Sequence, residues 1–313
     1  MTSKQRSRSG ASHDRVGPLL RDVPALAAAA AFLLTLLATG PVGKARAADA
    51  PYATQQVSFA SGELKIRALL GRPAGAGPFP AYISNHGSMT VQDAARGPWT
   101  SIVPGSTGDA LAKQGYVVLV VARRGHRGSE GTTTTYSTNL TSRAYGKRAS
   151  DVMRGAEAEA DDVIAALDYL QGLPFVDRDR IAVGGVSLGG LVSVMAAARD
   201  RRFRALISMA GGYRQTEKAG GADEAWPLVE ATWKKAADTI TVPTLILWSR
   251  NDLKLDVDVG RALEKALRRS GRNVEMKVYP GFEDDGHGLF SNPRGFPVFV
   301  PDVVRFLDTS LKP

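Results

Sequence analysis

The chain has 313 residues, of which 43% are hydrophobic and 23% charged, and it contains no cysteine. This composition is typical of one large globular domain or two small ones, and the lack of cysteine excludes disulfides, zinc–thiolate sites and a thiol nucleophile. The formal net charge of +9 falls to +4 without residues 1–47, which hold seven basic and two acidic groups. No later run of basic residues with interleaved aromatics is present, so we expect no nucleic-acid partner.

The first 47 residues have the pattern of a secretory signal peptide. A polar, basic stretch precedes the uncharged apolar run at 25–39, and Ala45–Ala47 is a small-x-small cleavage sequence. The apolar run is shorter than the roughly 20 residues that cross a bilayer. We therefore expect cleavage after Ala47 rather than a retained anchor, with no stable membrane span afterwards. This predicts an exported protein, periplasmic or extracellular, whose folded domain is residues 48–313.

Strand-like and helix-like segments alternate after residue 52. The predicted strands are residues 55–60, 64–73, 79–87, 116–122, 180–185, 203–211, 243–249 and 273–281. The predicted helices are residues 107–115, 150–171, 188–199, 258–269 and 297–311. The first two strands form a hairpin that turns at Ser61-Gly62. The pattern predicts an α/β fold with a mostly parallel central sheet, an antiparallel N-terminal hairpin and helices on both faces.

Two longer stretches interrupt this alternation. Residues 129–149 are polar and turn-rich, and residues 211–239 contain tryptophans and a helical piece. Both follow sheet strands, at the edge where open α/β sheets bind ligands, so each is either a surface loop or a lid. His126, Tyr136 and Trp226 are candidates to line a substrate pocket, with ordinary packing as the alternative for each.

A Gly-x-Ser-x-Gly sequence, Gly185 to Gly189, lies at the junction of a predicted strand and a predicted helix. Such a match alone is weak, and Ser187 is alternatively a small residue at an ordinary junction. The position favours a nucleophile, because a sharp strand-to-helix turn lifts a serine hydroxyl above the sheet. The flanking glycines allow the tight turn, and the helix N-terminus stabilises a developing oxyanion.

A serine hydroxyl needs a base to take its proton and an acid to orient that base. His287, in the loop after the last strand, is the one histidine late enough in the chain to be this base. Asp252 follows the strand at 243–249; Asp256 and Asp258 compete with it but lie at the start of the next helix, where acidic residues normally serve the helix dipole. The chain order is therefore Ser, Asp, His, as this architecture requires.

From about residue 55 onward the sequence resembles the α/β-hydrolase superfamily. The most similar groups are dienelactone-hydrolase-like esterases and the catalytic domain of prolyl-oligopeptidase-like peptidases. The matching motifs are Gly-Val-Ser-Leu-Gly at 185–189, Asn-His-Gly-Ser at 85–88, the Arg-Arg-Gly loop at 123–131, Asn251-Asp252 and Asp-Gly-His-Gly at 285–288.

The resemblance implies Ser187 as nucleophile, His287 as base and Asp252 as its orienter. It further implies that the backbone N–H groups of Ser88 and Leu188 form the oxyanion hole, and that neither a metal nor an organic cofactor is needed. Dienelactone hydrolases proper use cysteine, so serine here favours ordinary esters. We therefore expect an exported serine hydrolase that cleaves small carboxylic esters. The alternatives are a serine peptidase or acylaminoacyl hydrolase of the prolyl oligopeptidase type, and a non-catalytic binding protein with this fold.

Overall fold

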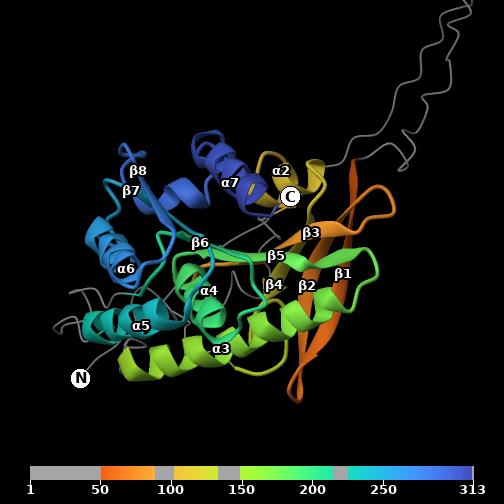
Figure 1. Cartoon of the computed structure of the whole chain (residues 1–313), viewed down its shortest axis with the longest axis horizontal. Coiled ribbons are helices and arrows are strands. Elements are labelled where there is room, and N and C mark those ends of the chain that lie inside the picture. Colours follow the sequence, from red (N-terminus) through yellow and green to blue (C-terminus); the bar gives the residue numbers. More distant parts are fainter. Residues whose placement is uncertain (1–50, 89–101, 133–148, 214–224, 312–313) are drawn as a thin grey trace, which may run out of the picture. The chain divides into compact units, whose positions relative to one another are not determined.

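In the part of the chain that the structure describes, eight strands form one mixed sheet with helices on both faces (Figure 1). The computed structural model describes residues 51–88, 102–132, 149–213 and 225–311, all within the compact unit of residues 47–313. The strands are β1 Tyr52–Ser61, β2 Leu64–Pro73, β3 Phe79–Asn85, β4 Val117–Ala122, β5 Val176–Val186, β6 Ala205–Met209, β7 Thr244–Ser249 and β8 Val274–Tyr279. The helices are α2 Thr107–Lys113, α3 Ala149–Gln171, α4 Leu188–Arg199, α5 Ala225–Thr239, α6 Val257–Arg269, the 3₁₀ helix η4 Gly286–Phe290, and α7 Phe296–Leu311.

The strand order across the sheet is β1-β2-β4-β3-β5-β6-β7-β8. β1 pairs with β2 and β2 with β4 in antiparallel fashion, whereas β4, β3 and β5 to β8 are all parallel. The β1–β2 hairpin turns at Gly62, whose φ of 56° is the left-handed conformation that a tight turn requires. The predicted mostly parallel sheet with an antiparallel N-terminal hairpin is confirmed.

Helices on the two faces bury the central strands. α2 and α7 pack together on one face, and α3, α4, α5 and α6 cover the other (Figure 1). Every residue of β4 is buried, which explains why its sequence is apolar throughout instead of alternating with polar residues. Three of the largest fully buried side chains are Trp233, Trp248 and Phe203. The sheet is thus a rigid platform for the loops at its edges.

β5 is longer than the sequence predicts. The predicted strand begins at residue 180, whereas β5 begins at Val176. The pairing with β3 is irregular at this point, and the first part of β5 is polar, with Arg180 Nε 2.6 Å from Asp177 Oδ2. The predicted start was wrong because these polar residues lack the apolar pattern that marks the buried part of the strand.

The two predicted lid segments, 129–149 and 211–239, are only partly covered by the structure. Residues 133–148 and 214–224, and with them Tyr136, lie outside the described residues. The second segment includes α5, which buries Val229 and Trp233 against the core. A lid role for either segment stays a prediction.

Candidate active site

The carboxyl ends of the parallel strands carry the residues that the sequence predicts for catalysis. Ser187 directly follows β5, and Ser88 lies in the loop after β3. Asp252 lies in the loop after β7, and His287 lies in η4, which follows β8. β3, β5, β6, β7 and β8 are successive neighbours and run parallel. All four residues therefore belong to the same edge of the sheet.

Ser187 has a strained backbone at the junction of β5 and α4. Its φ of 56° and ψ of −126° lie in a region that non-glycine residues occupy at a cost of about 1–3 kcal/mol. Its N–H donates to Met209 O at 2.9 Å, and its carbonyl accepts from the N–H groups of Gly190 (2.9 Å), Leu191 (3.2 Å) and Gly212 (3.1 Å). These bonds hold the sharp strand-to-helix turn that the sequence predicts. The residue is half-buried.

The loop after β3 passes directly beside this turn. A Cβ atom on Gly189 would lie 2.3 Å from the carbonyl oxygen of His86, so only glycine fits there. A Cβ atom on Gly87 would lie 3.3 Å from Ser187 Cβ and 3.9 Å from Ser187 Oγ. The two segments that the sequence predicts to contribute the oxyanion hole are therefore in contact next to the serine.

The two amides of the predicted oxyanion hole are those of Leu188 and Ser88. Leu188 is the first residue of α4, so its N–H has no acceptor within the helix. The positive end of the α4 dipole lies at the same place. Ser88 is exposed and follows Gly87, the residue that approaches Ser187. This environment favours negative charge on the oxygen of a carbonyl group that Ser187 attacks.

Asp252 and His287 form a buried pair. His287 Nδ1 lies 2.8 Å from Asp252 Oδ2, and the Asp252 side chain has no exposed surface, whereas that of His287 is 12% exposed. Asp252 Oδ1 accepts hydrogen bonds from the backbone N–H groups of Lys254 (2.9 Å) and Leu255 (2.8 Å). One carboxylate oxygen is thus fixed by the backbone and the other faces the imidazole. An imidazole oriented through Nδ1 in this way keeps Nε2 available as a base.

The other two described histidines are in a different environment. The rings of His86 and His126 are 4.4 Å apart, next to the fully buried Arg123, whose Nε lies 2.6 Å from Glu159 Oε2. Burial, followed by the charge of Arg123, lowers the pKa of His126 to about 4 and holds the pKa of His86 well below its ordinary value. Neutral imidazoles with such low pKa values are weak proton acceptors near pH 7. Within the described residues, His287 is therefore the histidine suited to general-base chemistry.

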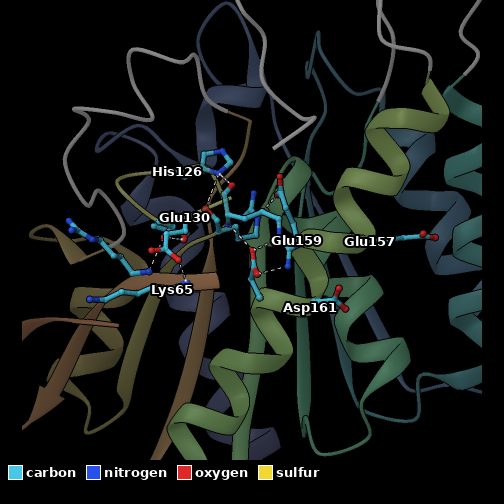
Figure 2. Close-up of polar contacts among 12 residues, drawn as sticks. Lys65, His126, Glu130, Glu157, Glu159 and Asp161 are labelled. Atoms are coloured by element: carbon cyan, nitrogen blue, oxygen red, sulfur yellow. Dashed lines mark hydrogen bonds and ion pairs between the residues drawn. The ribbon is translucent and has the colours of Figure 1, made fainter. Parts of the chain in front are cut away.

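The Arg-Gly loop at 123–131 is anchored between α3 and β2 (Figure 2). Arg124 forms an ion pair with the buried Asp162, with Nη2 2.8 Å from Oδ1. At the other side, Glu130 Oε2 accepts from the Lys65 N–H at 2.8 Å. His126, which is 1% exposed, has Nδ1 3.0 Å from the Arg124 carbonyl oxygen. A pocket-lining role for His126 stays a prediction, as it does for Trp226, which is half-buried in the first turn of α5.

Sequence reasoning missed two features of this site. The first is the role of Asp285, whose Oδ1 accepts from the backbone N–H groups of Leu253 and His287, both at 3.0 Å. Although burial raises the pKa of Asp285, these N–H bonds lower it overall. The buried Arg123–Glu159 pair was also missed. The sequence signal was Arg123, a charged residue directly after an apolar strand, together with an acidic residue, Glu159, in the predicted helix at 150–171.

Within the described ranges, no three or more His, Asp or Glu residues cluster in a way that would hold a metal ion. Over the same ranges, no helix combines the length and the apolar character needed to cross a membrane.

Known proteins resemble this chain over most of the described domain. Residues 106–313 match the model of the prolyl oligopeptidase family. The chain is 27% identical over 226 residues to dipeptidyl-peptidase 5 of Porphyromonas gingivalis, and the match covers 64% of this chain and 30% of that protein. The chain therefore spans less than a third of that relative's length.

Two solved structures share the fold. Pyrococcus horikoshii acylaminoacyl peptidase superposes with a TM-score of 0.61 at 18% identity, over 84% of this chain and 42% of that one. Acetyl xylan esterase 1 from Thermoanaerobacterium sp. superposes with a TM-score of 0.58 at 18% identity, over 82% of this chain and 83% of that one. The α/β-hydrolase fold that the sequence predicts is confirmed.

Proposed function

The chain belongs to the prolyl oligopeptidase family, and on that premise we propose that it cleaves carboxylic esters through an acyl-enzyme on Ser187. Family membership makes it a serine hydrolase. The observation that carries the proposal is the pair of contacts around Asp252: its carboxylate is fixed by two backbone N–H groups and faces His287 Nδ1 at 2.8 Å. This is the environment that a general base of an acyl-transfer enzyme requires.

The reaction follows from these groups. His287 Nε2 takes the proton of Ser187 Oγ while Oγ bonds to the acyl carbon, and the negative charge on the carbonyl oxygen is stabilised by the N–H groups of Leu188 and Ser88. The protonated imidazole then gives its proton to the alkoxide as the ester C–O bond breaks. Water attacks the acyl-serine, passes its proton to Nε2, and Oγ regains a proton as the carboxylic acid leaves. No metal or organic cofactor takes part in this scheme.

A peptidase or acylaminoacyl hydrolase is the second candidate, because the family model and the dipeptidyl-peptidase relative favour it. Small esters are supported by the likeness in fold to acetyl xylan esterase 1 from Thermoanaerobacterium sp.. They are also supported by serine in place of the cysteine of dienelactone hydrolases, which suits ordinary esters.

A substrate screen separates the two candidates. We expect p-nitrophenyl esters of short acyl chains to be hydrolysed with a kcat/KM at least about 100-fold higher than that of aminoacyl-p-nitroanilides, a difference of about 2.7 kcal/mol in activation free energy. Esters of increasing chain length and nitroanilides with free and acylated N-termini are compared at one enzyme concentration. A preference for nitroanilides would instead establish the peptidase function.

Export is part of the proposal. It is supported by the basic N-terminus, the apolar run at 25–39 and the cleavage sequence at Ala45–Ala47. Mass spectrometry of the protein recovered from the periplasm or the medium should find a mature N-terminus at Ala48. Full-length protein retained in the cytoplasm would contradict it.

A further inference from the structure

Asn251 joins the loop that carries Asp252 to the loop that carries His287. It precedes Asp252 directly, yet its side chain binds the backbone of the segment after β8. Asn251 Oδ1 accepts from the Phe282 N–H at 2.8 Å, and Asn251 Nδ2 donates to the Glu283 carbonyl at 2.9 Å. A backbone N–H can only donate, so the orientation of the amide is fixed.

Further bonds run between the same two loops. The Asn251 carbonyl accepts from the Gly286 N–H at 3.0 Å. The Ser249 hydroxyl lies 3.0 Å from Asn251 Oδ1 and 3.2 Å from the Pro280 carbonyl oxygen. The Asn251 side chain is thus enclosed by residues of the 280–286 segment. His287 follows this segment immediately, so its position depends on how the segment is held.

The backbone of the 280–286 segment is strained. Glu283 has a φ of 47°, a left-handed conformation that a residue with a Cβ atom adopts only when its surroundings enforce it. Its carbonyl is the acceptor of Asn251 Nδ2. Loss of that donor would release Glu283 towards ordinary φ values and shift the residues that follow it.

We propose that Asn251 is a positioning residue whose side-chain amide holds the His287 loop in the geometry required for proton transfer. The inference rests on the proposed roles of Asp252 and His287. A misplacement of about 1 Å in a reacting group costs up to about 100-fold in rate. Substrate binding does not depend on the base, so the loss should appear in kcat.

The test compares Asn251→Ala, Asn251→Asp and Asn292→Ala in the full-length protein with p-nitrophenyl acetate as substrate. Asn251→Asp has the same shape but sets a carboxylate oxygen against the Glu283 carbonyl. Asn292 is the matched control, because its amide contacts the Glu283 carboxylate, at 3.3 Å from both oxygens, and the Arg294 N–H at 3.0 Å, rather than the backbone of the 280–286 segment. We expect kcat to fall about 10- to 100-fold in both Asn251 variants, with KM within about threefold of the parent, and no change in Asn292→Ala.

A second readout does not involve catalysis. Amide hydrogen exchange at Phe282 should be at least about 10-fold faster in Asn251→Ala than in the parent, because the N–H loses its acceptor. A kcat within threefold of the parent in Asn251→Asp would overturn the inference, even if Asn251→Ala failed to fold. Failure of the proposed function is distinct from this: the parent protein would not hydrolyse p-nitrophenyl acetate, or hydrolysis would persist in Ser187→Ala.

Discussion

Ser187→Ala is expected to lower kcat for ester hydrolysis by a factor on the order of 10⁵–10⁶ and to abolish labelling by a fluorophosphonate probe. The magnitude is that seen when the nucleophile of a serine triad is removed, since the acyl-enzyme route is then closed. The probe reacts with the hydroxyl that the strained turn presents at the sheet edge, where φ is 56°. Intact-mass measurement of the labelled parent should show one probe per chain.

Stability measurements on two serine variants control for misfolding. Ser187→Ala retains a Cβ atom at the strained position, whereas Ser187→Gly removes it. Denaturant unfolding should therefore give Ser187→Gly a free energy of unfolding about 1–2 kcal/mol higher than that of Ser187→Ala, with both proteins folded and inactive. Labelling that survives in either variant would show that the nucleophile lies elsewhere. An unlabelled parent would favour a non-catalytic binding protein.

The sequence predicted the elements whose residues show a clear apolar pattern. β4 and the β5–α4 junction are examples: the first is apolar throughout, and at the second an apolar strand meets a helix of small residues. The predicted edge of the sheet follows from strand direction alone. For this reason the sequence alone predicts that Ser187, Asp252 and His287 lie at the same edge of the sheet.

The contacts that hold the site together could not be predicted in the same way. Asn251 and Phe282 are far apart in sequence, and neither belongs to a periodic pattern, so nothing local indicates that they bind each other. The same holds for Arg123 and Glu159, whose pairing requires knowledge of how α3 crosses the end of β4. The polar start of β5 was missed because its residues lack the apolar pattern of the buried part of the strand. Side-chain bonds between distant loops depend on tertiary geometry.

Asp252→Asn is expected to lower kcat about 10⁴-fold with little change in KM. Oδ1 of Asp252 accepts from the N–H groups of Lys254 and Leu255, so an asparagine must put its carbonyl oxygen there and its NH₂ group towards His287. Nδ1 must then accept a hydrogen bond, which moves the imidazole proton to Nε2. An Nε2 that carries a proton cannot take one from Ser187. Steady-state kinetics with p-nitrophenyl acetate measure the effect.

Asp256→Asn is the matched control, because the chemical change is identical and lies in the same loop. The Asp256 side chain accepts from the Asp258 N–H at 2.8 Å at the start of α6, and an asparagine caps a helix equally well. The kcat of Asp256→Asn should equal that of the parent. The fold of Asp252→Asn is checked by denaturant unfolding, since an amide keeps both backbone bonds. If kcat fell less than tenfold in Asp252→Asn but strongly in Asp256→Asn, the orienting carboxylate would be that of Asp256. Only the residue that binds His287 Nδ1 sets the tautomer of the imidazole.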